Sequence, residues 1–151
     1  MFMSSLKPGR KLGLVLVPFL LLTACSTTPE TTRVPLDRVI GIWTGPDGEE
    51  ISLAADHTFS STNLAANKLA ADDCPEKQTQ GSWSFYADLG DGMYGTSKEA
   101  SSGDWIGLSF EGLPQEDCAL DLAVVNRGKT LCATIDPDDP CSFDVRFSRE
   151  K

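Results

Sequence analysis

The chain has little of the chemistry that most enzymes need. It contains a single histidine, His57, and no Gly-x-Ser-x-Gly motif. Zinc sites are typically built from closely spaced cysteine pairs, and the five cysteines include no Cys-x-x-Cys. Cysteines that are oxidised to disulfides provide no thiolate nucleophile. We therefore expect a protein that is not an enzyme and that carries neither a cofactor nor a metal.

Positive charge is also scarce. Thirteen Lys and Arg residues stand against 22 Asp and Glu residues, which gives a net charge of −9. Such a surface is repelled by phosphate backbones, so we expect no nucleic-acid partner. The acids Asp136, Asp138 and Asp139 surround Pro137 and are interpreted as turn residues. Their spacing is not that of a regular calcium-binding loop.

The longest apolar run is too short to span a membrane. Leu12 to Leu22 has 11 residues, whereas a transmembrane helix needs about 20. A basic segment precedes the run, and Leu-Thr-Ala-Cys, ending at Cys25, follows it. These are the parts of a signal peptide, and the last four residues match the bacterial lipobox. We predict that residues 1–24 are a lipoprotein signal peptide and that Cys25 is lipidated; a secretory signal with a chance cysteine is the alternative.

Two further segments follow the signal. Residues 25–35 comprise the lipidated cysteine and a Thr/Pro-rich tether, and residues 36–151 have the length of a single domain. Two or three acyl chains anchor a protein stably to a bilayer. The sequence therefore predicts a chain in the cell envelope, lipid-anchored to a membrane on its extracytoplasmic side.

Beyond Cys25 the cysteines are even in number, which in an exported domain predicts two disulfides with three possible connectivities. The four are Cys74, Cys118, Cys132 and Cys141. Cys132 and Cys141 are close in sequence and flank a turn, which favours Cys132–Cys141 together with Cys74–Cys118. However, strict alternation leaves Cys132 and Cys141 on opposite faces unless a bulge near Pro140 shifts the register.

Short stretches of alternating apolar and polar residues dominate the domain. They predict eight strands, at residues 39–44, 49–54, 58–64, 81–86, 105–110, 118–125, 130–135 and 142–148. Residues 87–103 are rich in Gly, Asp and Ser and are predicted to form a mobile loop, and residues 65–80 are compatible with one short helix. Short turns between successive strands favour an all-β fold, a small antiparallel up-and-down barrel whose closure removes exposed edges. A β-sandwich is the alternative.

Gly41-Ile42-Trp43 at the start of the first predicted strand resembles the Gly-x-Trp signature of lipocalins and the wider calycin barrels. In that family the tryptophan plugs the closed end of the barrel, and a basic side chain from the last strand packs across it. The resemblance implies these roles for Trp43 and for Arg149, which continues the inward-facing set of the last strand. The run from Trp43 to Phe59 also resembles a group of small actinobacterial lipoproteins, mostly without assigned function, in which glycine usually stands at the place of His57.

Two functions are compatible with this pattern. The first is a non-catalytic envelope interaction or inhibitor-like module whose loop surface contacts another protein. The second is lipocalin-like binding of a small apolar or amphipathic ligand inside the barrel. The expected lining of such a cavity is Phe59, Leu120, Leu122 and Phe143. Small barrels of eight short strands usually fill their own interior, which favours the first function.

Overall fold

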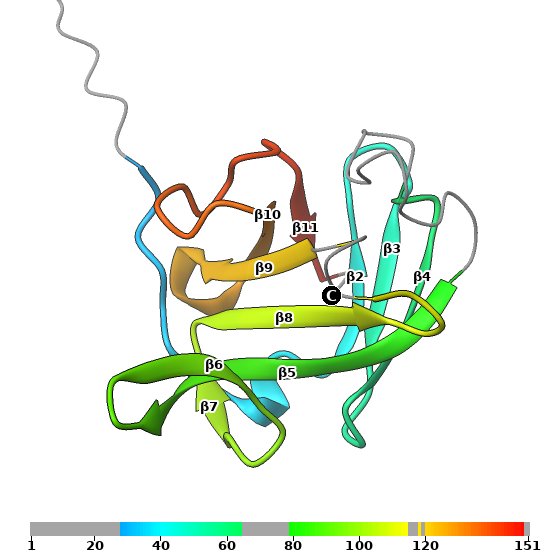
Figure 1. Ribbon diagram of the computed structural model, residues 1–151. Helices are drawn as coiled ribbons and strands as arrows, with labels where there is room; N and C mark the ends of the chain where they lie inside the picture. The colour runs from blue at the N-terminus through cyan, green and yellow to red at the C-terminus, as the bar shows by residue number, and fades with distance from the viewer. Residues whose placement is uncertain (1–27, 65–78, 115–117, 119, 150–151) are drawn as a thin grey trace, which may run out of the picture.

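The fold is an antiparallel barrel of eight strands, seen in a computed structural model that describes residues 28–64, 79–114, 118 and 120–149 (Figure 1). The barrel strands are β2 (Gly41–Thr44), β3 (Glu50–Leu53), β4 (Thr58–Thr62), β5 (Thr79–Gly90), β8 (Trp105–Phe110), β9 (Leu120–Val125), β10 (Thr130–Thr134) and β11 (Arg146–Ser148). They follow the order β4-β3-β2-β11-β10-β9-β8-β5, and β5 pairs with β4 to close the barrel. The predicted up-and-down barrel is therefore confirmed, and the alternative β-sandwich does not form.

Three short strands lie outside the barrel. β6 (Met93–Ser97) pairs with the second half of β5, and β1 (Val34–Pro35) pairs with β7 (Ser102–Gly103). Two 3-10 helices, η1 (Leu36–Arg38) and η3 (Asn126–Gly128), complete the regular structure of the described residues. No helix among those residues has the length and apolar character needed to cross a bilayer.

The prediction of a loop at residues 87–103 is wrong. β5 continues to Gly90 and turns back through Asp91 and Gly92 into β6, and β7 follows. Asp91 and Gly92 have φ angles of 53° and 76°, which are the left-handed values that a tight hairpin turn needs. The polar composition of this stretch reflects a solvent-exposed hairpin, which projects beyond the barrel in Figure 1.

Large side chains fill the interior of the barrel. Inward-facing residues of neighbouring strands lie opposite one another, as Trp83 lies opposite Leu108 and Phe85 opposite Ile106. The largest of the fully buried side chains are Trp43, Trp83, Phe85, Phe147, Ile51, Leu53, Ile106, Leu108, Leu120, Leu122 and Leu131. Each such side chain contributes about 1.5–3 kcal/mol when it is removed from water. The interior is therefore the hydrophobic core of the protein.

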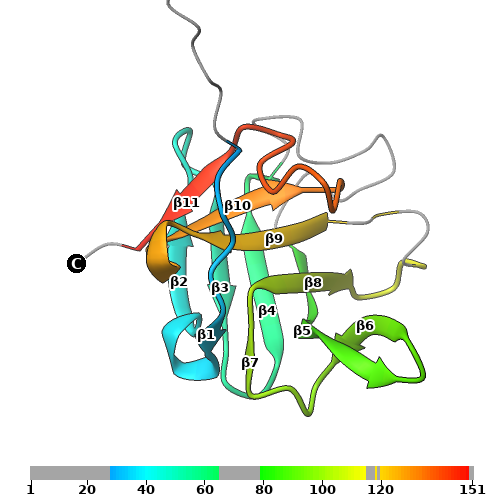
Figure 2. The same ribbon diagram turned by 90° about the vertical axis from the view of Figure 1, so that its left-hand side faces the viewer.

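The segment before the barrel packs against it. Thr31 pairs with Val125, and the amide of Thr32 donates to the carbonyl of Val124 at 2.7 Å. Val34 is buried and faces Gly128, where an added Cβ would lie 2.8 Å from the valine methyl group. Figure 2 shows this segment running alongside the end of β9 on its way to β1. Residues 31–35, which the sequence assigns to the tether, therefore belong to the folded domain, because Val34 has an apolar site to occupy.

Cys132 and Cys141 form a disulfide, with their Cα atoms 5.0 Å apart. Strict alternation does not extend back to Cys141, because residues 141–143 form a turn and Asp144 has a φ of 53°. As a consequence β11 begins at Arg146 and is shorter than the predicted strand at residues 142–148. Cys118 is also disulfide-bonded. Its predicted partner Cys74 lies outside the described residues, as does most of the segment in which a short helix was expected.

Candidate functional site

Four strands place aromatic and acidic side chains on the outer face of the barrel. Gly107 lies opposite both Ser84 and Asp121, and Asp88 lies opposite Tyr94, so β6, β5, β8 and β9 present one continuous face. A pocket of about 440 Å³ opens on this face. It is lined by Tyr86, Tyr94, Trp105, Asp121 and Pro137. We call it the aromatic pocket.

A glycine allows the pocket to form. A Cβ at Gly107 would lie 2.6 Å from the Thr96 methyl group and 3.2 Å from the Tyr86 ring. Because Gly107 has no side chain, the Tyr86 ring can lie against β8. Its ring centroid is 5.8 Å from that of Tyr94, and the two planes are tilted by only 21°. The two rings therefore form a stacked pair beside Trp105, which is the only partly exposed tryptophan of the three.

Asp121 lies beside Tyr86 within the pocket. The Tyr86 hydroxyl hydrogen-bonds to the Asp121 carboxylate and is 3.2 Å from each of its oxygens. Burial raises the pKa of Asp121, and burial together with this carboxylate raises the pKa of Tyr86 to about 12. Burial also raises the pKa of Tyr94, with a smaller contribution from Asp104. The pocket therefore disfavours further negative charge.

The Asp121 carboxylate has no cationic partner among the described residues. The ion pairs in that part of the chain join Arg33 to Asp104, at 4.0 Å, and Arg146 to Asp144, at 2.8 Å. Arg33 also donates a hydrogen bond to the carbonyl of Ser102. The guanidinium of Arg33 is thus held by groups other than Asp121.

The Cys132–Cys141 disulfide secures the loop that carries Pro137. The Thr134 hydroxyl lies 2.8 Å from that of Ser142, 2.7 Å from the carbonyl oxygen of Asp139 and 3.0 Å from that of Asp136. Because this hydroxyl is buried and has several hydrogen-bond partners in the loop, it stabilises the conformation of the loop. Pro137 is therefore a fixed wall of the pocket.

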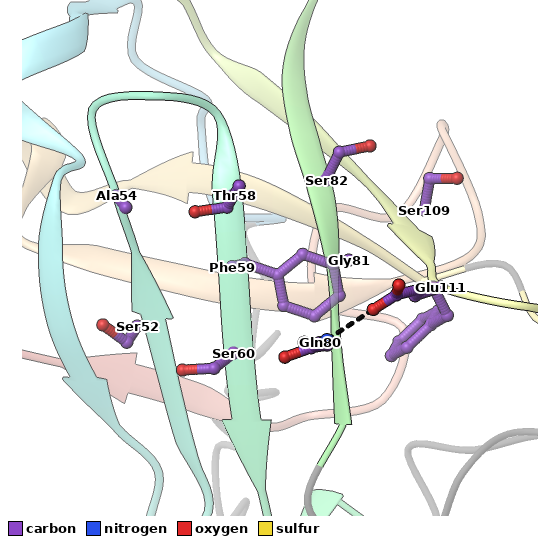
Figure 3. A pocket seen from close by; sticks show the side chains of 11 residues that line it. Ser52, Ala54, Thr58, Phe59, Ser60, Gln80, Gly81, Ser82, Ser109 and Glu111 are labelled. Carbon is purple, nitrogen blue, oxygen red and sulfur yellow. Dashed lines mark hydrogen bonds between the residues drawn. The ribbon is translucent and has the colours of Figure 1, made fainter.

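A second recess, of about 590 Å³, lies on the outer face of β3, β4, β5 and β8 (Figure 3). We call it the hydroxyl-rich groove, because five of its lining side chains carry hydroxyl groups. The lining residues are Ser52, Ala54, Thr58, Phe59, Ser60, Gln80, Gly81, Ser82, Ser109, Phe110 and Glu111. The side-chain amide of Gln80 donates to the Glu111 carboxylate at one edge, as the dashed line in Figure 3 shows. The carboxylate of this groove, Glu111, is hydrogen-bonded to an amide at the exposed surface. The carboxylate of the aromatic pocket, Asp121, is instead partly buried and hydrogen-bonded to a tyrosine.

Among the described residues, three buried side-chain oxygens have no hydrogen-bond partner; one is Oδ1 of Asp104, which is 4.0 Å from the Arg33 guanidinium, and the other two belong to the packed part of the domain. These two are Oε1 of Glu49 and Oγ of Ser61, and both residues are buried. The other carboxylate oxygen of Glu49 accepts a hydrogen bond from the amide of Asp47 at 2.9 Å. Neither residue lines the aromatic pocket or the hydroxyl-rich groove, so the pair belongs to the packed part of the barrel.

The residues expected to line an interior cavity occupy different surroundings. Leu120 and Leu122 are buried in the core, and Phe143 is partly buried against it. Phe59 is buried and lines the hydroxyl-rich groove. The structure therefore does not gather these four side chains around a single recess. The predicted lipidation site, Cys25, lies outside the described residues.

At the Gly-x-Trp motif the structure has the contacts that the resemblance implies. The Arg149 guanidinium carbon lies 5.2 Å from the centroid of the Trp43 ring. A side chain at Gly41 would meet that guanidinium, and the φ angle of Gly41 is 132°. Gly41 is therefore required both for its backbone conformation and for the space that Arg149 occupies.

His57 takes part in a turn. Its φ of 65° is a left-handed value that favours glycine. Its ring Nδ1 is 3.1 Å from the carbonyl oxygen of Trp83, and its ring centroid is 4.8 Å from that of Trp83. These contacts account for the side chain as a structural one.

Sequence reasoning did not identify Tyr86, Tyr94 or Asp121. The two tyrosines flank the Asp91-Gly92 dipeptide, which is a typical hairpin turn. That dipeptide was the available signal, because a hairpin there sets Tyr94 and Tyr86 on neighbouring strands. No comparable signal marks Asp121, whose position depends on pairing between β8 and β9.

The fold and the pocket together define a class of protein: a closed, eight-stranded, lipocalin-like barrel with an added edge strand and a filled interior. Among the described residues, no three His, Cys, Asp or Glu side chains are grouped as metal ligands would be. Comparisons with models of protein families, with curated proteins and with solved structures found no match.

Proposed function

We propose that this chain is a lipid-anchored, extracytoplasmic and non-catalytic interaction module of the cell envelope. It recognises an envelope partner, in the manner of an adaptor or an inhibitor, through the outer face that carries the aromatic pocket and the β5–β6 hairpin. The observation that carries the proposal is the position of this pocket outside a barrel whose interior is filled by its own side chains.

The filled interior favours a function at the outer surface over the carriage of a ligand inside the barrel. A lipocalin-like carrier needs space for its ligand between the strands. Here Trp43, Trp83 and Phe85 are each at most 1% exposed and belong to the hydrophobic core of the barrel. Opening a cavity of ligand size would require these side chains to leave a close-packed core.

The β5–β6 hairpin has the exposed apolar surface that protein interfaces use. Leu89, Met93 and Tyr94 are 51–59% exposed, although all three are large and apolar or aromatic. Such residues are uncommon on solvated surfaces when they are grouped, and grouped ones mark contact sites. β6 is also an edge strand, which has unpaired backbone groups available to a partner.

The lipid anchor would hold this module close to the membrane. Cys25 is six residues before Thr31, the first residue that pairs with the barrel. Six extended residues span about 20 Å. The proposed anchor therefore keeps the end of β9 within about that distance of the lipid surface, and replacing Cys25 with serine is expected to release the chain from the membrane fraction.

Photo-crosslinking in intact cells tests the proposal. A photoreactive residue is placed at Met93 in the hairpin or, as a matched control, at Ile42 on β2, which is 56% exposed. We expect a discrete adduct from position 93 that is absent from position 42 and is lost when Trp105 is replaced by alanine. Equal adducts from both positions, or none from position 93, would contradict the proposal.

A further inference from the structure

We infer that the aromatic pocket binds an alkylammonium group, which lies against the faces of Tyr94 and Trp105 and pairs with the Asp121 carboxylate. This inference deepens the proposed function, on which it rests for the location of the binding site. It adds the chemical class of the group that a bound partner presents. The evidence comes from the rings, the carboxylate and the fixed walls of the pocket.

Aromatic rings supply the first part of the recognition. The faces of tyrosine and tryptophan carry negative partial charge and attract cations that come within about 6 Å of the ring centre. The pocket gathers Tyr86, Tyr94 and Trp105, and these include both tyrosines of the chain. Alkylated ammonium groups suit such a site better than strongly hydrated ions do, because their carbon atoms also pack against the rings.

The carboxylate supplies the second part. Asp121 is partly buried, hydrogen-bonded to Tyr86, and has no ion-pair partner among the described residues. Burying an ionised carboxylate is unfavourable unless an opposite charge accompanies it. A bound cation would supply that charge at the one lining residue of the pocket that is acidic.

The charge of the pocket also excludes other ligands. An anion would face the Asp121 carboxylate, and the loop that carries Pro137 adds the nearby acids Asp136, Asp138 and Asp139 in sequence. A neutral apolar ligand would fill the space but leave the carboxylate without a counter-charge. An alkylammonium group satisfies the rings and the carboxylate together.

The pocket has a suitable size and fixed walls. Its volume of about 440 Å³ lies within the usual range for small-molecule sites. The Cys132–Cys141 disulfide holds the Pro137 side, and β-sheet pairing holds the four strands that carry the other lining residues. A site with walls fixed in this way loses little conformational freedom on binding.

Calorimetric titration of the full-length chain, purified from the cell fraction in which it is found, tests the inference. Choline is compared with 3,3-dimethylbutan-1-ol, which has the same shape but no charge. We expect choline to bind at least about tenfold more tightly than the neutral compound. Equal binding of the two compounds, or binding of neither, would overturn the inference.

Variants assign the binding to the pocket. Asp121→Asn and Tyr94→Ala are each expected to weaken choline binding by about tenfold or more. Tyr94 is 59% exposed, so its replacement tests the site even if a change at Asp121 impairs folding. Asp37→Asn, which removes an exposed carboxylate from η1, is the matched control and is expected to leave binding unchanged. Unaltered binding in Tyr94→Ala would overturn the assignment.

A second arm distinguishes the sources of the alkylammonium group. A capped Gly-Lys-Gly peptide presents the lysine side chain of a protein partner, whereas tetramethylammonium chloride supplies a free small quaternary ammonium ion. Tighter binding of the peptide assigns the group to a protein, and tighter binding of tetramethylammonium assigns it to a small molecule. Loss of the crosslink from Met93 with retained choline binding would contradict the proposed function while supporting the ligand class.

Discussion

The guanidinium of Arg149 lies over the indole ring of Trp43, 5.2 Å from the ring centroid. The same side chain donates hydrogen bonds to the carbonyls of Arg38 and Ile40, while the indole nitrogen donates to the carbonyl of Val39 at 2.7 Å. These contacts join the end of β11 to the segment that precedes β2. One arginine therefore closes this end of the barrel and connects two segments more than 100 residues apart.

Replacing Arg149 by alanine is expected to lower the free energy of unfolding by about 1–2 kcal/mol, because a cation–π contact and two hydrogen bonds are lost. Arg149→Lys should recover part of the lost free energy of unfolding, since an ammonium group would still lie over the Trp43 ring. Urea denaturation measures the difference. Arg146→Ala, on the same strand, removes only a surface ion pair and serves as the control, with an expected change of less than about 1 kcal/mol. Equal stability of the two alanine variants would argue against a structural role for Arg149.

Gly81→Ala is expected to be strongly destabilising. An added Cβ would overlap the carbonyl oxygen of Ser109 and lie 2.8 Å from the Phe59 ring, at the point where β5 joins β4 to β8. Overpacking of this kind costs about 1–3 kcal/mol. Thermal unfolding of Gly81→Ala is compared with that of Gly95→Ala, where the new methyl group meets only the exposed side chain of Leu89. A Gly81→Ala protein as stable as Gly95→Ala would show that the barrel does not close as described.

Removing the Cys132–Cys141 disulfide with two alanines is expected to destabilise the domain by about 2–3 kcal/mol. The bond closes a short loop, with a sequence separation of 9, and so restricts the unfolded chain only moderately. Denaturant unfolding measures the loss. Reduction of the wild type also breaks the bond of Cys118, so a reduced protein should be less stable than the double variant. A double variant as stable as the oxidised wild type would contradict this account.

The two tyrosines should titrate late, because burial raises the pKa of both and brings that of Tyr86 to about 12. The folded state then keeps a proton that the unfolded state loses near pH 10. The contribution of Tyr86 to stability is therefore fully present below pH 10 and is lost as the pH rises to about 12. Ultraviolet absorbance of the phenolates measures the pKa values of the two tyrosines.

Two variants separate the causes of the shift. Tyr86→Phe leaves Tyr94 as the single tyrosine, so its titration can be followed alone. Asp121→Asn should lower the pKa of Tyr86 only partway toward its ordinary value, because burial is the larger cause and persists. Two tyrosines that titrate together at their ordinary pKa would show that the pocket is fully solvated.

Much of the barrel was predictable because its strands alternate regularly. Inward residues such as Ile51 and Leu53 on β3, or Leu120 and Leu122 on β9, are spaced by two, as the pleat of a strand requires. Because the turns between them are short, strands that follow one another in the sequence were expected to pair. The Gly-x-Trp resemblance added the partner of Trp43, because it specified a basic residue at the end of the last strand.

The features that were missed depend on pairing between distant strands or on single residues with positive φ. Residues 141–143 form a turn and Asp144 has a positive φ, so alternation along the predicted strand could not place Cys141, and no local pattern marks this irregularity. β6 was missed because Met93 and Tyr94 stand in a stretch that is otherwise rich in Gly, Asp and Ser, although Asp91-Gly92 marks a turn. The aromatic pocket combines residues of β5, β6, β8, β9 and a disulfide-bonded loop, so it forms only when the register of these strands is set.

Quenching of tryptophan fluorescence by acrylamide tests most directly the claim that the barrel is filled and that its accessible aromatic site is outside. Trp43 and Trp83 are at most 1% exposed, whereas Trp105 lines the aromatic pocket. We predict that most of the quenchable emission is lost in Trp105→Phe, leaving a signal that acrylamide scarcely affects. Quenching that persists in Trp105→Phe would show that small molecules reach the barrel interior, and would contradict the account.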